Sequence, residues 1–406
     1  MGRKGTKKLL STGVVDGKLK APSLAKPLTT TPIHRIADLA DFREPWRQLA
    51  AGAPMQSPEW LFTWLQYYTA PEDELCVLLF HEPKGSLVGV APLYIQKAGG
   101  SATVRLLGSG DACTNHTTWL AAPGRETQIG HEVARFLLEH KSDWDSLHLE
   151  WIDDGDAAIT TTVDYLEKNG CFLRRWPLAN CWEIALPPTW DDYLKMLSRK
   201  HRKQCRRLLK KYFDSGRVQT RKVRSEKELQ EGFKILLQLH GARWGDRKNP
   251  KGVFSDRKFR SFHETVARKL LKRQQLNLVW LEYDGTPISA EYQFIDENTV
   301  YAYQAGMDPS FIELRPGQLS ILTSIRSAIE QGRQSFDLSR GNEPYKAHYR
   351  ATPRACHDLF VWPDRFAGRL GYSLGYSMMR MRYYAKVGRY LAAQWLQKGM
   401  EFRNNN

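Results

Sequence analysis

The chain has few cysteines, and none of them is paired at short spacing. The six are scattered through 406 residues, with no Cys-x-x-Cys pair and no Cys/His cluster at the spacing of a metal site. They are Cys76, Cys113, Cys171, Cys181, Cys205 and Cys356. This pattern argues against a disulfide framework and against a structural zinc site, so we expect no metal. A reducing cytoplasm is the simplest setting for such a chain.

The chain lacks long apolar runs, and its acidic residues are fewer than its basic ones. No run reaches the length of a membrane span, and no apolar core follows the basic N-terminus, so we expect a cytoplasmic protein without a signal peptide. The chain has 60 Lys and Arg against 44 Asp and Glu, a formal net charge of +16. This charge favours polyanionic partners, which include nucleic acid, anionic membranes and phosphorylated ligands, and does not choose among them.

The remaining composition is that of a packed globular protein. Hydrophobic residues make up 42% and aromatic residues 11% of the chain, and its length suggests two to three domains. Residues 1–30 are rich in Lys, Thr, Pro and Gly and are expected to form a flexible basic tail. Pro187-Pro188 predicts a boundary between an N-terminal unit at 31–186 and a C-terminal unit at 187–363. Residues 364–406 are expected to form a basic amphipathic helical tail, which can pack on the domain or lie on an anionic membrane.

Both units show the same order of expected elements. In the first, helices are expected at residues 45–50, 58–68, 125–141 and 159–169, and strands at 75–80, 87–96, 103–107, 117–120, 146–151 and 181–186. In the second, strands are expected at residues 278–283, 288–295, 299–306 and 336–338, and a helix at 319–331. Each series opens with two apolar strands joined by a short turn. The sequence therefore predicts an α+β fold built from two copies of one plan.

The clearest single helix is expected from Thr189 to Phe213. Thr189 and Asp192 give it a capping-box-like start, and apolar residues recur on one face. The rest of the surface is basic, with almost no acids: Arg199, Lys200, Arg202, Lys203, Arg206, Arg207, Lys210 and Lys211. Such a face is either a solvated surface or a contact for a polyanion.

A glycine turn, Arg315-Pro316-Gly317-Gln318, precedes the helix at 319–331. The first N–H groups of a helix lack partners within it and lie at the positive end of its dipole, so they can hold a phosphate. Two antiparallel apolar strands are expected beside this turn. The combination suggests a nucleotide-tailed donor such as coenzyme A.

These motifs resemble the acyl-CoA N-acyltransferase (GNAT) superfamily, and within it the BioF2-like or CelD-like acetyltransferases, which are related to the FemA/FemX aminoacyltransferases. The likeness covers about residues 33–355 and is strongest over 190–350. It is carried by the basic helix at 198–211, Asp284-Gly285-Thr286-Pro287-Ile288, the strand at 301–306, the Arg-Pro-Gly-Gln-Leu turn, and the segments 336–337 and 341–346. It implies tandem GNAT-like folds, each a mixed, mostly antiparallel sheet flanked by helices, with catalysis in the second.

The resemblance also implies a donor, acetyl-CoA or another acyl-CoA used as co-substrate. Arg315, Gly317 and Gln318, with the backbone N–H groups of Leu319 and Ser320, would hold its pyrophosphate. The fuller superfamily pattern has an Arg or Gln and two glycines, whereas this turn keeps one glycine. That difference leaves the donor open between acyl-CoA and aminoacyl-tRNA.

Acyl transfer to an amine needs a stabilised oxyanion and a route for protons. By analogy with the family, a backbone N–H near Tyr292 or Gln293, where the two central strands would separate, meets the oxyanion. Glu291 is the candidate general base, although a strand Glu is more often solvated or paired. Tyr345 or Tyr303 would protonate the leaving thiolate, although strand tyrosines usually serve packing.

Three further residues are candidates for binding the acceptor. Lys346 would contact a phosphate or an acidic substrate. Asp337 is either a substrate contact or a loop anchor. Trp244 would line the acceptor cleft with His240, which is otherwise an ordinary helix residue. Asn115-His116 is a polar loop pair to which the sequence gives no chemistry.

The resemblance favours an N-acyltransferase, in particular an acetyltransferase. Its acceptor would be an amine, with an amino sugar or another precursor of exopolysaccharide or cell-envelope synthesis as the expected class. A FemX-like aminoacyltransferase that uses charged tRNA is the first alternative. The second is a non-catalytic protein that binds a polyanion or membrane on a GNAT scaffold. In each case the basic helices would allow contact with the inner face of an anionic membrane.

Overall fold

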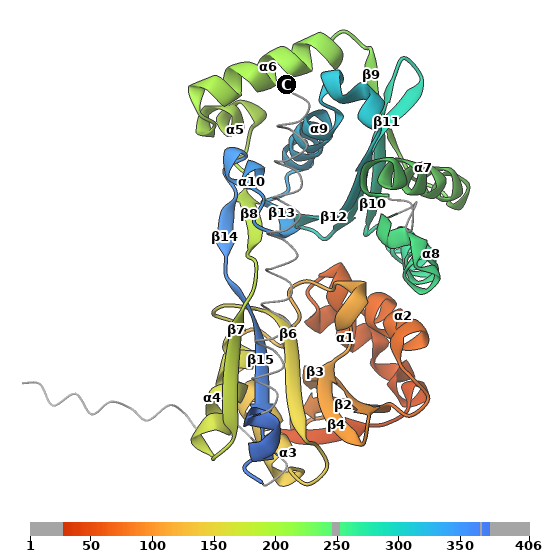
Figure 1. Ribbon diagram of the computed structural model, residues 1–406. Helices are drawn as coiled ribbons and strands as arrows, with labels where there is room; N and C mark the ends of the chain where they lie inside the picture. The colour runs from red at the N-terminus through yellow and green to blue at the C-terminus, as the bar shows by residue number, and fades with distance from the viewer. Residues whose placement is uncertain (1–26, 246–251, 366–367, 374–406) are drawn as a thin grey trace, which may run out of the picture.

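The computed structural model describes residues 27–245, 252–365 and 368–373. Most of the expected basic tail at 1–30 and of the expected helix after residue 364 lies outside these residues. The described strands form two sheets, one above the other in Figure 1, with helices on their faces. Nearly all neighbouring strands are antiparallel. The α+β class and the tandem arrangement predicted from the sequence are therefore confirmed.

The first sheet has the strand order β1-β2-β3-β4-β6-β15-β7, with β5 paired to β3. Its strands are β1 (Thr29–Ile33), β2 (Glu74–His81), β3 (Leu87–Ala98), β4 (Ser101–Leu106), β5 (Leu120–Ala121), β6 (Ser146–Asp153), β7 (Phe172–Pro177) and β15 (Cys356–Trp362). The helices that precede or flank them are α1 (Arg43–Leu49), α2 (Pro58–Tyr68), α3 (Glu126–Glu139) and α4 (Ala157–Lys168). Strands β4 and β6 are parallel and are joined through α3.

The second sheet has the order β14-β8-β13-β12-β11-β10-β9. Its strands are β8 (Cys181–Ala185), β9 (Val218–Lys222), β10 (Leu276–Tyr283), β11 (Thr286–Ile295), β12 (Thr299–Met307), β13 (Ser335–Arg340) and β14 (Thr352–Arg354). The helices are α5 (Trp190–Met196), α6 (Arg199–Tyr212), α7 (Glu226–Trp244), α8 (Arg257–Lys272), α9 (Pro316–Glu330) and α10 (Tyr345–His348). Here β12 and β13 are the parallel pair, joined through α9. The second sheet thus repeats the plan of the first.

The two sheets exchange one strand each. Strand β15, near the C-terminus, lies between β6 and β7 of the first sheet, and β8 lies at the equivalent place between β13 and β14 of the second. The connections β7–β8 and β14–β15 therefore both run from one sheet to the other (Figure 1). The sequence assigned the strand at 181–186 to the first unit and residues up to 363 to the second. The structure corrects both assignments. Strand β8, before residue 187, belongs to the second sheet, and β15, after it, belongs to the first.

The helix expected from Thr189 to Phe213 is two helices. Leu197 has extended backbone angles (φ −70°, ψ 151°) and ends α5. Ser198 then starts α6, and its side chain accepts a hydrogen bond from the His201 backbone N–H. Apolar periodicity continues through the break, so the sequence pattern hid it. The expected cap at Thr189 is confirmed, because its side chain accepts from the N–H of Asp192.

A shared hydrophobic core joins the two units. Helices α1 and α2 of the first unit pack with α7, α8 and the central strands of the second. Trp60 of α2 lies at its centre and makes edge contacts with Phe262 and Phe294. Two further cores lie under α3 and α4 and under α5, α6 and α9. The two sheets are therefore fixed relative to each other by packing as well as by the exchanged strands.

Candidate active site

A large cavity opens where two parallel strands separate. Strands β12 and β13 pair only from Thr299 to Tyr301 and from Ser335 to Asp337, and diverge beyond these residues. The resulting cleft has a volume of about 1390 Å³. It is bounded by the divergent strands, the start of α9, the end of α7, one side of α6 and the α10 loop. Beyond Tyr301 the peptide groups of β12 no longer pair with β13, although the Ala302 carbonyl accepts a hydrogen bond from the Ser339 hydroxyl.

Two irregularities shape β12 beside the cleft. The pairing register with β11 shifts between Tyr292 and Gln293, which leaves Tyr303 as an extra residue on β12. Such a bulge bends a strand and re-aims its side chains. Further along, a Cβ on Gly306 would lie 2.3 Å from the backbone nitrogen of His240. Glycine at 306 therefore allows α7 to approach the strand that forms one wall of the cleft.

Glu291 lies in β11, on the face that meets α9, and borders the cleft. Its residue surface is only 5% exposed. Burial raises the pKa of the Glu291 carboxyl to about 7, although a hydrogen bond with Ser320 and the charge of Arg243 act to lower it. A carboxyl with a pKa near 7 can accept a proton at neutral pH, as a general base must. Its place in the cleft fits the role predicted for it, which stays a prediction.

The start of α9 also faces the cleft, through Arg315, Gly317 and Gln318. Arg315 has a left-handed backbone (φ 54°) and precedes the first turn of the helix. However, the N–H of Leu319 donates to the Arg315 carbonyl at 3.0 Å, and the Leu319 side chain is buried. The predicted phosphate contact through the N–H of Leu319 is therefore wrong. Ser320 is also buried, and its side chain hydrogen-bonds Glu291, whereas the phosphate contact predicted for its N–H stays a prediction.

Tyr292 and Gln293 do not border the opening. Strand β11 pairs on both sides, with β10 and with β12, so it is not one of the separating strands. Tyr292 is fully buried in the shared core, and the Gln293 side chain donates to the Ser324 hydroxyl at 3.1 Å. The prediction that a backbone N–H of these residues meets the oxyanion is therefore wrong, because it was placed on β11 and the neighbouring strand β12 borders the gap. The strands that separate at the cleft are β12 and β13.

The two candidate tyrosines differ in how their hydroxyl groups are held. The Tyr303 hydroxyl donates to the Ala112 carbonyl at 2.6 Å and lies 3.1 Å from His263 Nε2. Burial raises its pKa well above the ordinary value. Tyr345, at the start of α10, is 39% exposed and lies in the cleft wall. Burial of its hydroxyl, and then the charges of Glu343 and Glu291, raise its pKa to about 12. Tyr345 is therefore the better placed proton donor.

The walls of the cleft come mostly from the second unit. Trp244 is 55% exposed and donates its indole N–H to the Ala305 carbonyl at 3.1 Å. His240 also lines the cleft, and its Nε2 lies 3.1 Å from Gln304 Oε1. Both residues border the cleft as the sequence suggested, although neither is shown to bind an acceptor.

Residues 199–347 match a family model described as an acetyltransferase (GNAT) domain. The chain therefore carries a GNAT-type acyltransferase domain. The matched segment contains the cleft-forming strands β12 and β13, helix α9 and Glu291. No curated protein sequence matches the chain.

Two solved structures are similar to this acyltransferase over most of its length. One is the crystal structure of FemX, with 12% sequence identity, coverage of 85% of this chain and 99% of the other, and a TM-score of 0.58. The second is a conserved protein of unknown function from Bacteroides thetaiotaomicron, with 9% identity, coverage of 83% and 100%, and a TM-score of 0.50. At these identities the likeness is one of fold. It extends over both sheets.

Lys346 of the acyltransferase stabilises the loop after β13. Only 2% of the residue is exposed, and its ammonium group donates to the carbonyls of Ser339, Arg340 and Gly341 at 2.8–3.3 Å. It also pairs with Glu343 at 3.1 Å. With its donors occupied, the predicted contact with a phosphate or acidic substrate is wrong. Lys346 instead fixes the α10 loop that carries Tyr345.

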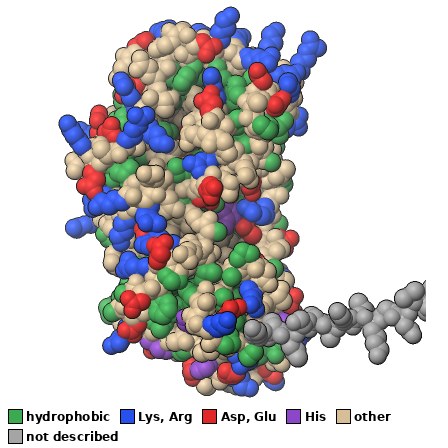
Figure 2. All heavy atoms as spheres, turned by 180° about the vertical axis from the view of Figure 1, so that it is seen from behind, with side chains coloured by type: hydrophobic (Ala, Val, Ile, Leu, Met, Phe, Trp, Pro, Cys, Tyr) green, Lys and Arg blue, Asp and Glu red, His purple; other side chains and the backbone are tan. Residues whose placement is uncertain are grey.

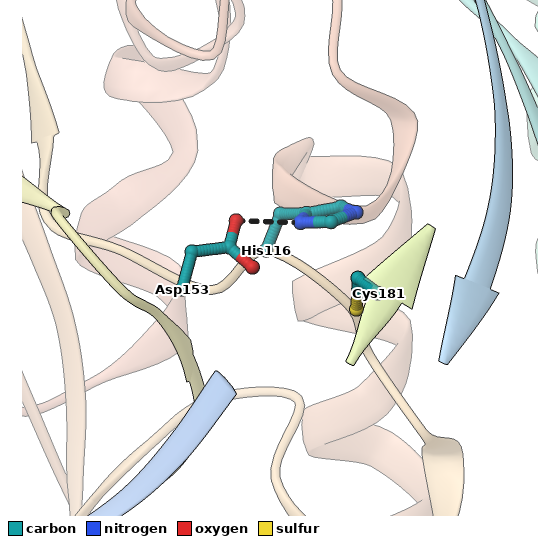
Figure 3. Close-up of side chains that lie close together, drawn as sticks. All are labelled: His116, Asp153 and Cys181. Carbon is teal, nitrogen blue, oxygen red and sulfur yellow. Dashed lines mark hydrogen bonds and ion pairs between the residues drawn. The ribbon is translucent and has the colours of Figure 1, made fainter. Parts of the chain in front are cut away.

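Asp337 lies outside the cleft. Its carboxylate is buried and contacts His116 Nε2 at 2.7 Å. His116 Nδ1 lies 2.6 Å from Asp153 (Figure 3). Burial acts to lower the pKa of His116, but the two carboxylates outweigh it and raise the pKa to about 10. Asp337 thus joins the two units, and of the two predicted roles the structure favours the loop anchor.

Sequence reasoning missed a polar group at the rim of the cleft. His201 and Gln204 of α6 line it, and Gln204 donates to the side-chain oxygen of Gln318 at 3.2 Å. Their spacing of three residues places them on one side of α6 next to the cationic residues, and this is the signal that would have found them. Among the described residues no helix is long and apolar enough to cross a membrane.

Proposed function

We propose that this acyltransferase moves an acyl group from acyl-CoA to an amine, with Glu291 as general base. The buried carboxyl of Glu291, with its pKa raised to about 7 beside the cleft, is the observation that carries the proposal. An amine reacts only when it is neutral, and a base with a pKa near 7 can take its proton at physiological pH.

The gap between β12 and β13 supports an extended thioester donor. A pantetheine arm is polar along its length, and the peptide groups of β12 in the gap can pair with it as a strand would. Arg315 and the rim residue Gln318 lie at one end of the gap, where the phosphates of coenzyme A would lie. The acyl carbonyl would then lie near Glu291, in the middle of the cleft.

The chemical step follows from this arrangement. The amine nitrogen attacks the thioester carbonyl, a C–N bond forms, and Glu291 takes the proton of the amine. A backbone N–H of β12 stabilises the oxyanion. When the C–S bond breaks, the thiolate of coenzyme A takes a proton from the Tyr345 hydroxyl. The products are an amide and free coenzyme A.

The acceptor we propose is an amino group on a sugar or another precursor of exopolysaccharide or envelope synthesis. The support for this class is the resemblance of the sequence to the BioF2-like and CelD-like acetyltransferases. The volume of the cleft, about 1390 Å³, agrees with an acceptor that binds together with the donor.

Isothermal titration with acetyl-CoA and with a longer acyl-CoA tests the donor. We expect saturable binding of at least one of them, and release of free thiol when an amine panel is added. The Glu291→Gln variant should bind the donor and fail to release thiol. If a folded sample binds neither acyl-CoA, the proposal is wrong.

A specific observation favours aminoacyl-tRNA as the second candidate donor. The cationic residues of α6 listed above are mostly exposed, and among the described residues only Asp191 approaches them, at 4.0 Å from Arg206. In Figure 2 Lys and Arg side chains protrude at the upper end of the molecule, where Figure 1 places α6. A filter-binding salt series with tRNA discriminates the two donors. Binding that falls steeply with salt supports tRNA, and no binding at low salt excludes it.

A further inference from the structure

Four side chains of metal-ligand type meet where the exchanged strands cross between the two sheets. His116 lies in the loop before β5, Asp153 ends β6, Cys181 begins β8 and Cys356 begins β15. Three of these side chains each place one ligand atom within 4.8 Å of the other two: His116, Asp153 and Cys181 (Figure 3). The fourth side chain adjoins them, because Cys356 Sγ lies 3.5 Å from Asp153 Oδ1 and the two thiols contact each other. The four ligands come from four separate segments of the chain.

Both nitrogens of the His116 ring face carboxylate oxygens. Nε2 lies 2.7 Å from Asp337 and Nδ1 lies 2.6 Å from Asp153. A neutral imidazole has a single N–H, so one of these short contacts needs a second ring proton, and a metal ion bound at that nitrogen would take the place of this proton. The contact with Asp337 matches the way a metal-bound histidine is oriented, with its other N–H donated to a carboxylate. Nδ1, which faces Asp153, is then the ligand atom.

The donor set selects a thiophilic ion. Two thiols, an imidazole and one carboxylate fit the tetrahedral coordination of zinc, whereas calcium and magnesium prefer oxygen ligands. Zinc bound by two thiolates and a carboxylate keeps one excess negative charge. The Arg354 guanidinium compensates it, because its Nε lies 3.6 Å from the Asp153 carboxylate.

The geometry requires only side-chain adjustment. The ligand atoms of one tetrahedral zinc lie about 3.3–3.8 Å apart, given bonds of about 2.0–2.3 Å. The ligand atoms of His116, Asp153 and Cys181 lie within 4.8 Å of one another, and the contact of Nδ1 with Asp153 is shorter, at 2.6 Å, so these side chains must shift by about 1 Å. Arg354 Nη2, now 3.3 Å from Nδ1, must also move aside. Cys181 and Cys356 are nearly fully buried. His116 and Asp153 line a second cavity, of about 460 Å³, which gives an ion a path to the site.

We propose that His116, Asp153, Cys181 and Cys356 bind one zinc ion, which ties the two exchanged strands together. The site is structural, because all four coordination positions come from the protein. No short-range spacing marks the site in the sequence, because its ligands are far apart in the chain and are brought together only by the strand exchange. The site is separate from Glu291 and does not depend on which acyl donor is used.

Metal analysis and competition with a chromophoric chelator test this proposal on the full chain. The protein is stripped with a chelator and titrated with zinc alone, and cobalt is then substituted. We expect one zinc per chain, thiolate-to-cobalt charge-transfer bands, and a higher Tm with zinc. Cys181→Ser and Cys356→Ser should each weaken zinc binding by at least tenfold and reduce the charge-transfer bands. Asp337→Asn should weaken it about 10- to 100-fold through the orientation of His116.

Cys171→Ser and Cys205→Ser are the matched controls, because these buried cysteines lie in other parts of the fold. They should leave zinc binding unchanged. If Cys181→Ser fails to fold, Asp153→Asn is used instead; it keeps both thiols and should also weaken zinc binding. The proposal is overturned if the protein binds no stoichiometric zinc, in which case a second proton on His116 accounts for the contacts. Equal losses in the control variants would overturn it as well.

Discussion

Ser320, in the second turn of α9, hydrogen-bonds the carboxyl of Glu291 in the neighbouring strand β11. The same carboxyl is almost completely buried and feels the positive charge of Arg243. Burial favours its neutral form, whereas Ser320 and Arg243 favour its charged form. The net result is a pKa of about 7 for Glu291, so the carboxyl can both accept and release a proton near neutral pH.

The first prediction concerns the Glu291→Gln variant. It should lower kcat by about 10²- to 10⁴-fold, because the amide cannot take the proton of the amine. KM for the acyl-CoA should change by no more than a few-fold, since Glu291 does not contact the phosphates. Steady-state thiol release measures both constants. Glu231→Gln, at an exposed position of α7, is the matched control and should behave like the wild type. A normal kcat in the Glu291 variant would exclude its role as base.

The second prediction is a pH profile. Burial raises the pKa of Glu291 from 4.5 to about 7, and the base acts in its ionised form. The rate kcat/KM should therefore rise with pH and level off above about 7. In Glu291→Gln this limb should disappear. A limb near pH 4.5 in the wild type would show that a solvated carboxyl, and not Glu291, is being titrated.

The third prediction uses the hydrogen bond from Ser320. Because this bond lowers the pKa of Glu291, its removal in Ser320→Ala should raise that pKa. The rising limb of the profile should move to higher pH, while the rate on the plateau is kept. Ser327→Ala, on the same helix, is the matched control. No movement of the limb would mean that Ser320 does not contact the carboxyl in solution.

The fourth prediction separates the two tyrosines. Tyr345→Phe should lower kcat with little effect on folding, because Tyr345 lines the cleft and is 39% exposed. Tyr303→Phe should lower the free energy of unfolding by about 1 kcal/mol, since its hydroxyl donates to the Ala112 carbonyl. Thermal unfolding and steady-state rates are measured on both variants. If the effects are exchanged, with the rate lost in Tyr303→Phe alone, Tyr303 is the proton donor.

The fifth prediction compares two glycines that border the cleft. A Cβ on Gly306 would lie 2.3 Å from backbone atoms of α7, so Gly306→Ala should destabilise the protein by about 1–3 kcal/mol. A Cβ on Gly317 would meet only Met307 Sδ, at 3.6 Å, which is an ordinary contact. Gly317→Ala should therefore keep the wild-type Tm. Equal Tm values for the two variants would show that α7 does not lie this close to β12.

Much of the fold could be predicted from the sequence, because local patterns set it. Helix α2 spans Pro58–Tyr68, as predicted, and Glu291 is indeed in the middle of a strand. The break at Leu197 was not predictable, since the apolar spacing is continuous through it. The exchange of β8 and β15 was also hidden, because either strand has a pattern that fits either sheet.

The candidate site was predicted less well than the fold. Alternation along β11 directs Glu291 toward α9 and Tyr292 into the shared core, so two adjacent candidates separate to opposite faces. Lys346 was chosen for its charge, but the carbonyls that it satisfies become visible only when the loop is folded. A sequence gives residue types and their spacing, whereas roles of this kind depend on which groups remain unpaired in three dimensions.

The strand exchange has a consequence for how the protein is made. During translation the first sheet stays incomplete until residues 356–362 have left the ribosome, because β15 fills the place between β6 and β7. The nascent first unit must therefore wait, with the edges of β6 and β7 unpaired, while the chain from Pro177 to Cys356 is synthesised. A polypeptide cut at Pro187 carries β8 without its sheet and lacks β15. Neither half is an autonomous folding unit, and the two halves should unfold together in a single transition.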